Sequence, residues 1–199
     1  MSVSKGQGDL FSEGNLYIQA NTFPEGISIS KEFLENWQKR IYTHQSIFFD
    51  KTTSKIRQTS LFKEASNDYS IENFSPLRLT PLPINFWKWS ESYHFGPAIY
   101  IVMDRTSFNG QHLILYIGET IAADKRWKGD HDCKSYLDNY CSALRKAGMS
   151  SQLSIRFWTD VPKQTKERRK IEQILIKRWL PPFNKETRSC WQTPFTAEI

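Results

Sequence analysis

The chain has 199 residues, enough for one or two domains and for a hydrophobic core that needs no disulfide bonds. Its 39% hydrophobic and 24% charged residues exclude wholesale disorder. No apolar run approaches the length of a membrane-spanning helix, about 18 residues. The first residues lack the apolar stretch of a secretory signal, and the cysteines are few and odd in number. We therefore expect a cytoplasmic protein without a membrane partner.

The net charge of +6 is carried by the second half of the chain. Residues 1–92 hold 10 Lys and Arg against 10 Asp and Glu, whereas residues 93–199 hold 17 against 11. This asymmetry favours an anionic partner for the second half, with nucleic acid as the first candidate, although a mildly basic surface explains it equally well. We divide the chain into an extension of unknown role, residues 1–92, and a domain, residues 93–199.

The extension is expected to contain one helix. Ser30 can cap it, and four apolar residues follow at helical spacing: Phe33, Leu34, Trp37 and Ile41. Residues 1–25 resemble a mobile arm, and residues 50–75 are polar and indicate an irregular connection. Residues 76–86 contain three prolines and cannot continue a helix.

The second half predicts an α+β domain. Apolar, β-branched runs indicate strands at 98–103, 112–118 and 153–161, and Asn109-Gly110 indicates a turn between the first two. Segments 121–128 and 134–147 are polar and compatible with one or more helices, and segment 163–180 favours a helix with Pro162 at its start. A short hairpin makes neighbouring strands antiparallel. We therefore expect a small central antiparallel three-stranded sheet flanked by helices.

Alternation along the strands predicts which side chains share a face. The aliphatic face should hold Ile99, Ile101 and Met103 with Leu113, Leu115 and Ile117. Tyr100 and Tyr116 should lie together on the other face. A tight two-residue turn at Asn109-Gly110 would put one tyrosine on the wrong face, so the hairpin needs a longer loop or a bulge. Taken alone, two strand tyrosines are more often packing residues.

Glu172 is the one acidic residue at the edge of the apolar stripe on the last predicted helix. A carboxylate at this edge can reach a pocket between the helix and the sheet. The alternative is a surface pair with Arg168, four residues earlier, worth about 0.3–0.5 kcal/mol.

These features together resemble the GIY-YIG endonuclease superfamily. Ala98-Ile99-Tyr100 and Tyr116-Ile117-Gly118 resemble its two signatures. Arg126, eight residues after Gly118, matches its phosphate-binding arginine; Glu172 matches its metal-binding carboxylate; and Asn184 matches its terminal asparagine. The resemblance covers residues 94–185 approximately.

Four features depart from the family pattern. Ala98 replaces a glycine, and the two signatures lie further apart than usual. Glu119 stands where many relatives carry a lysine. Relatives often place His or Tyr four residues after the arginine, but here that position is Asp130 and His131 follows it.

The resemblance implies a metal-dependent DNA endonuclease that hydrolyses phosphodiester bonds in repair, recombination or restriction. It implies Mg²⁺ or Mn²⁺ on Glu172 and a phosphate on Arg126. Tyr100 would orient or deprotonate the attacking water, helped by the metal, Tyr116 or His131, while Asn184 would hold the geometry by hydrogen bonds. The expected catalytic set is Tyr100, Tyr116, Arg126, His131, Glu172 and Asn184.

Basic side chains provide candidate DNA contacts. They are Arg126, Lys128, Lys166, Arg169 and Lys170. A scaffold that binds DNA without cutting it is the alternative function, and Glu119 and the offset of His131 are its sequence support. A structural zinc site is disfavoured because His131, Cys133, Cys141 and Cys190 include no Cys-x-x-Cys pair.

Two pentapeptides resemble the motif by which bacterial proteins bind the DNA sliding clamp. A Leu-Phe pair would fill an apolar pocket and Gln would add polar specificity. The residues concerned are Gln7, Leu10 and Phe11 in the first pentapeptide, and Gln58, Leu61 and Phe62 in the second. Clamp tethering is therefore a second binding hypothesis. The sequence does not predict the oligomeric state.

Overall fold

The computed structural model describes residues 29–54, 71, 74–88, 94–107, 110–128 and 131–196. Its helices are α1 (Lys31–Ser54), α2 (Asp132–Lys146) and α3 (Thr165–Trp179), and its strands are β1 (Leu82–Pro83), β2 (Ala98–Thr106), β3 (His112–Thr120) and β4 (Ser151–Trp158). The predicted α+β class is confirmed. None of the helices in these ranges is long and apolar enough to cross a membrane.

The sheet is antiparallel and has the strand order β1-β4-β2-β3. The expectation of three strands was wrong, because Leu82 and Pro83 add a short strand against Ile155 and Ser154 of β4. A residue before proline favours extended backbone, and an edge strand tolerates the missing N–H of Pro83. β2, which carries Tyr100, lies in the interior of the sheet between β3 and β4.

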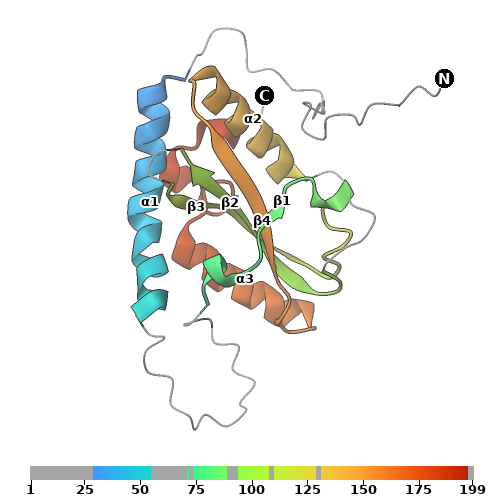
Figure 1. Ribbon diagram of the computed structural model, residues 1–199. Coiled ribbons are helices and arrows are strands. Elements are labelled where there is room, and N and C mark those ends of the chain that lie inside the picture. Colours follow the sequence, from blue (N-terminus) through green and yellow to red (C-terminus); the bar gives the residue numbers. More distant parts are fainter. Residues whose placement is uncertain are drawn as a thin grey trace, which may run out of the picture.

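Helices α2 and α3 lie on opposite faces of the sheet (Figure 1), and each face has its own hydrophobic core. α2 packs on one face, where Leu137 and Tyr140 join Tyr100 and Val102 in one core. α3 packs on the other face, where its buried residues join the second core. These residues are Ile171, Leu175, Ile176 and Trp179. The result is a three-layer arrangement of α2, sheet and α3.

A β-bulge in the β2–β3 hairpin changes which side chains of β3 lie on each face of the sheet, compared with the prediction. Val102 pairs with Tyr116 but Met103 pairs with Ile114, so Leu115 is an extra residue in β3. The expected bulge is confirmed, and it keeps the two tyrosines on one face. It also moves Leu113 and Leu115 to the tyrosine face, whereas Ile114 joins the aliphatic face with Ile117. The predicted shared face of Leu113, Leu115 and Ile117 was therefore wrong, because one extra residue inverts the alternation.

Helix α1 lies beside β3, the last strand of the sheet (Figure 1). Three of its predicted core residues, Leu34, Trp37 and Ile41, are buried in the α2-side core, while Phe33 is exposed. The helix continues to Ser54, into the segment predicted to be irregular. The boundary at residue 93 stays a prediction, but the described residues before it share the core of the domain.

Segment 121–128, which was compatible with a helix, is a series of turns. The turns begin where Thr120 Oγ1 both accepts the backbone N–H of Ala122 (3.0 Å) and donates to its carbonyl oxygen (3.2 Å). Ala123 N then donates to Gly96 O over 2.9 Å, which ties the segment to the chain just before β2. The contact with Gly96 and the hydrogen bonds of Thr120 outweigh the weak helical preference of the segment and bring Arg126 back over the sheet.

Candidate active site

Tyr100 and Gly118 lie opposite each other on β2 and β3. The Tyr100 ring covers Gly118 so closely that a Cβ there would collide with Cζ and the hydroxyl oxygen. The second signature therefore ends in glycine for a steric reason. Tyr116 stacks beside Tyr100, with 5.9 Å between ring centroids and 22° between planes.

The hydroxyl oxygen of Tyr100 has two nitrogen partners from distant parts of the chain. Arg126 Nε donates to it over 3.2 Å, and His131 Nε2 lies 2.8 Å away. His131 Nδ1 accepts the backbone N–H of Cys133 over 3.0 Å, so the proton of the neutral imidazole is on Nε2. Nε2 therefore donates to Tyr100. The structure thus brings three of the expected catalytic residues into direct contact.

The position of His131 follows from helix capping and aromatic packing. His131 is the N-cap of α2, where its Nδ1 satisfies one of the free N–H groups of the first turn. Its ring stacks on buried Trp127 at 5.4 Å and 2°. Asp130, which occupies the family position by residue count, lies outside the described residues.

Burial controls the protonation of these groups. It raises the pKa of Tyr100 well above its usual value, with a further rise from Tyr116, although Arg126 acts in the opposite direction. Burial also raises the pKa of Tyr116 to about 12. Burial and the positive charge of Arg126 together lower the pKa of His131 to about 4. At neutral pH both phenols keep their protons and the imidazole is uncharged.

A hollow of about 300 Å³ opens beside this cluster. Its lining residues are Tyr116, Arg126, His131, Asp132, Tyr136, Phe183, Lys185 and Arg188. Three cationic side chains and one carboxylate therefore surround it, a combination that suits an anionic ligand. Tyr116 borders the hollow, whereas Tyr100 is fully buried behind Arg126 and His131.

Asn184 holds the edge of β3 and does not line the hollow. Its Oδ1 accepts Ile117 N over 2.9 Å and its Nδ2 donates to Ile117 O over 2.8 Å. The preceding residue, Phe183, donates its N–H to Leu115 O over 3.0 Å. After α3 the chain therefore crosses the β3 edge from one face of the sheet to the other. The expected role of Asn184, holding geometry by hydrogen bonds, agrees with this arrangement.

Glu172 lies next to the same edge. Its Oε1 accepts the backbone N–H of Glu119 over 2.9 Å. Burial and, next to it, the nearby Glu119 carboxylate raise the pKa of Glu172 to about 7. Its charge also helps to raise the pKa of Tyr116, so the two groups are within electrostatic reach of each other. Glu172 is not part of the lining of the hollow.

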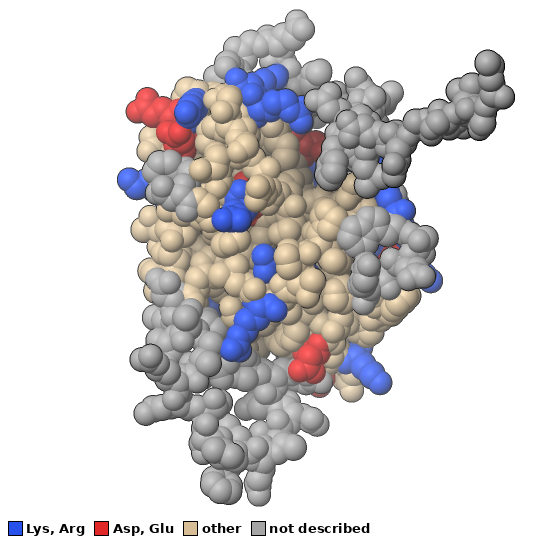
Figure 2. All heavy atoms as spheres, viewed as in Figure 1, with Lys and Arg blue, Asp and Glu red and all other residues tan. Residues whose placement is uncertain are grey.

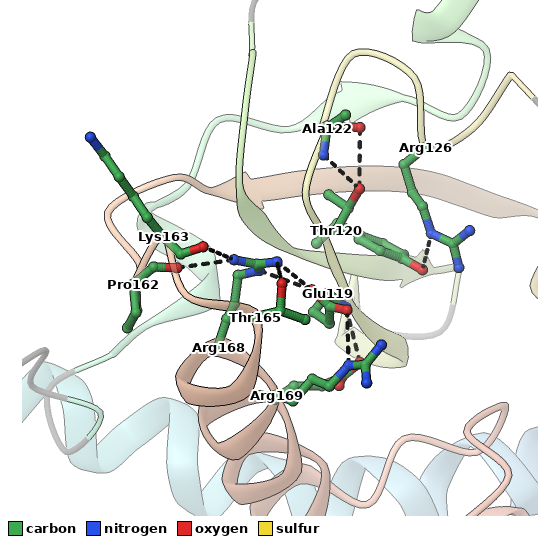
Figure 3. Close-up of polar contacts among 11 residues, drawn as sticks. Glu119, Thr120, Ala122, Arg126, Pro162, Lys163, Thr165, Arg168 and Arg169 are labelled. Carbon is green, nitrogen blue, oxygen red and sulfur yellow. Dashed lines mark hydrogen bonds and ion pairs between the residues drawn. The ribbon is translucent and has the colours of Figure 1, made fainter.

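Arg168 does not form the surface pair with Glu172 that was the alternative interpretation. It is fully buried and binds the Glu119 carboxylate, with Nη2 2.8 Å from Oε2 (Figure 3). It also donates to the carbonyls of Pro162 and Lys163 and to Thr165 Oγ1. Arg168 therefore joins the start of α3 to the end of β3. Glu119 is the other half of this joint.

The predicted DNA contacts have different surroundings. Lys128, Lys166 and Lys170 are exposed, whereas Arg169 reaches Glu119 Oε1 over 3.3 Å (Figure 3). On the face drawn in Figure 2, Lys and Arg side chains are spread over the surface and form no continuous band. Only Arg126 of the predicted DNA contacts lines the hollow.

Sequence reasoning missed Tyr136, Lys185 and Arg188 in the lining of the hollow. Lys185 directly follows Asn184, a predicted site residue, and this position in the sequence could have indicated that Lys185 lies near the site. Gln45 was also missed; its side-chain amide binds both backbone polar atoms of Ile114 on β3. The clamp-motif residues Gln7, Leu10, Phe11, Gln58, Leu61 and Phe62 lie outside the described residues.

Within the described ranges, no group of three or more His, Cys, Asp and Glu side chains is arranged to hold a metal ion. His131 and the three cysteines are therefore not gathered into a zinc site. A metal on Glu172 would have to take its other ligands from water and substrate.

Comparisons with known proteins assign no family. No family model matches the chain, and no match is found among the curated proteins or the solved structures.

Proposed function

We propose that the protein is a metal-dependent DNA endonuclease of the GIY-YIG type. The observation that carries the proposal is the convergence of Arg126 and His131 on the hydroxyl of Tyr100, beside a hollow whose lining holds three cationic side chains and one carboxylate. The residues converge from β2, from the turns after β3 and from the N-cap of α2. Such an arrangement suits the binding of a phosphate and the stabilisation of charge during its hydrolysis.

Arg126 is the proposed phosphate ligand. Its Nε is engaged by Tyr100, which orients the guanidinium plane at the hollow. The two terminal nitrogens can then bind two oxygens of one phosphate, a geometry that a lysine cannot provide. Tyr100 and His131 act here as positioning residues.

Tyr116, and not Tyr100, is the phenol proposed to meet the attacking water. Tyr116 borders the hollow, whereas Tyr100 is buried beneath it. This revises the expectation that Tyr100 acts directly on water. With its pKa at about 12, Tyr116 is protonated at neutral pH and serves to orient water by hydrogen bonds.

Glu172 fits the role of a metal ligand. It is a partly buried carboxylate whose pKa is raised by burial and by the Glu119 and Glu186 carboxylates, and the charge of Arg169 offsets this rise only in part. Mg²⁺ or Mn²⁺ prefers carboxylate oxygens and keeps several water ligands, which suits a site with one acidic side chain. When bound, the cation would supply Lewis-acid stabilisation of the reacting phosphate.

The test is nicking of supercoiled, linear, single-stranded and branched DNA with and without Mg²⁺ or Mn²⁺. We expect cleavage that requires the metal and falls about 100-fold or more in Arg126→Ala and Glu172→Gln. Arg145→Ala, at an exposed position in the last turn of α2, is the matched control and should keep full activity. Metal-independent cleavage, or full activity in Arg126→Ala, would contradict the proposal.

A DNA-binding protein without nuclease activity is the second candidate. The observation that favours it is that Glu172 lies outside the lining of the hollow and is engaged by Glu119 N. In that case DNA would bind with unchanged affinity in Glu172→Gln, and no substrate would be nicked with either metal. Sliding-clamp binding is a separate hypothesis; a pull-down comparing Leu10→Ala/Phe11→Ala and Leu61→Ala/Phe62→Ala tests it.

A further inference from the structure

The lining of the hollow includes two cationic side chains, Lys185 and Arg188, to which the proposed hydrolysis at Arg126 gives no role. In the part of the chain that the structure describes, neither cation belongs to an ion pair. Asp132 is the one carboxylate in the lining, so the three cations of the hollow exceed its anions.

The backbone that carries these two residues is held in place. Asn184 N–H and C=O both take part in the turn: Asn184 N donates to Pro181 O, and Asn184 O accepts Thr187 N and Arg188 N over 3.1 and 2.9 Å. The Asn184 side chain is tied to β3 through Ile117, as described above. Trp191 Nε1 adds a bond of 2.6 Å to Leu180 O. Lys185 and Arg188 therefore project from a rigid base, which lowers the entropic cost of binding a ligand.

The dimensions of the hollow indicate more than a single phosphate. A volume of about 300 Å³ is at the lower end of the range for small-molecule pockets. Arg126 accounts for one anionic group, and Lys185 and Arg188 are available for another. A polyanionic strand supplies two phosphates joined by a sugar, which matches two cationic groups in one hollow.

We propose that Lys185 and Arg188 form a subsite for a second phosphate of the DNA strand, next to the phosphate bound by Arg126. This inference rests on the proposed function and names two of its substrate contacts. The subsite fixes the register of the DNA strand. When both phosphates are bound at once, the DNA backbone can take only one position relative to Tyr116. Phosphate contacts of this kind position the strand without reading its sequence.

The experiment measures binding of a short fluorescein-labelled DNA duplex to the full chain by anisotropy, in EDTA, over a series of KCl concentrations. Each neutralised phosphate contributes about 0.9 to the slope of log K against log salt. Lys185→Ala and Arg188→Ala should each weaken binding, and together they should reduce the magnitude of the slope by about 0.9, because both side chains bind the same phosphate. Lys185→Arg keeps the positive charge, so its salt slope should equal that of the parent protein. Arg145→Ala should also leave the slope unchanged.

Cleavage assays separate this inference from the nuclease proposal. With Mg²⁺, the two subsite variants should raise KM more than they lower kcat, whereas Arg126→Ala should lower kcat. If the parent protein cleaves DNA but the two subsite variants have the same salt slope as the parent, the subsite proposal is wrong. The nuclease proposal is then unaffected. Reduced slopes in a protein that cuts no DNA would support the phosphate contacts and overturn cleavage. If the parent chain binds no DNA, both are wrong.

Discussion

His131 Nε2 lies 2.8 Å from the hydroxyl oxygen of Tyr100, although the two residues are 31 positions apart in the chain. The contact forms because His131 caps α2, and α2 packs on the face of the sheet that carries Tyr100. The imidazole must be neutral with its proton on Nε2 to satisfy both Tyr100 and Cys133 N. The protonation of His131 is therefore part of the geometry of the site.

We predict that His131 stays uncharged throughout the neutral range. Burial and the charge of Arg126 lower its pKa to about 4, so its Cε1–H resonance should titrate near that pH and not near 6.5. Histidine NMR titration measures this, with His131→Gln to assign the signal. Arg126→Ala should move the midpoint upward. A midpoint close to 6.5 in the parent protein would show that the ring is more exposed than the structure has it.

Gly118→Ala should destabilise the fold by about 1–3 kcal/mol, since the new methyl group would collide with the Tyr100 ring. Urea unfolding provides the free energy. Combining it with Tyr100→Ala removes the collision, so the double variant should lose less stability than the sum of the two single variants. Strict additivity in this cycle would mean that the two side chains do not meet.

Arg168 and Arg169 offer a matched pair of substitutions, because both donate to the Glu119 carboxylate. The side chain of Arg168 is 0% exposed and that of Arg169 is 68% exposed. Removing one partner of a buried ion pair costs about 3–5 kcal/mol, whereas an exposed pair contributes about 0–1. Arg168→Ala should therefore lower the free energy of unfolding severely and Arg169→Ala hardly at all. Equal effects would contradict this division of roles.

Gln45 of α1 should stabilise the edge of β3. Its Nε2 donates to Ile114 O and to Trp179 O over 2.9 Å each, and its Oε1 accepts Ile114 N over 2.8 Å. Gln45→Leu leaves these buried backbone groups without partners and should cost about 2–3 kcal/mol. Lys39→Ala, at an exposed position of the same helix, is the control for thermal or urea unfolding. A loss no larger than that of the control would argue against the edge contact.

Asp104 should make stability depend on pH. It is fully buried, accepts bonds from Tyr140 Oη and Gln152 N, and burial raises its pKa to about 6. From about pH 4 to about pH 6 the folded protein keeps a proton that the unfolded chain has released. This contribution to the free energy of unfolding therefore falls as the pH rises, by up to about 2–3 kcal/mol.

Asp104→Asn should remove the fall in the free energy of unfolding that the titration of Asp104 causes as the pH rises. His131 acts in the opposite direction, because its pKa is lowered on folding and its contribution is lost as the pH falls from about 6.5 towards 4. The quantity to compare is therefore the difference between parent and variant at each pH. The exposed Asp160→Asn serves as control. A parent–variant difference that is constant over this range would rule out Asp104 as the titrating group.

Local sequence patterns predicted the elements that build the domain. Apolar, β-branched runs marked β2, β3 and β4, and helical spacing after Ser30 marked α1, because these signals depend on neighbours within four residues. Tyr100, Tyr116 and Arg126 were also identified from the sequence as candidate site residues. Two of the missed features, β1 and the turns at 121–128, depend on partners further away: Ile155 for β1 and Gly96 for the turns.

Only the tertiary structure decided which of these residues meet and how. One extra residue, Leu115, reversed the faces of half of β3, since alternation transmits a single-residue shift to every later position. The β3 edge needs partners for its free backbone groups, and Gln45, Asn184 and Glu172 come from three other segments to bind them. The sequence by itself therefore determined the strands, the helices and the candidate chemical groups. Packing and hydrogen bonding across long chain separations decided that Tyr100 is buried, that Tyr116 borders the hollow and that Lys185 and Arg188 join it.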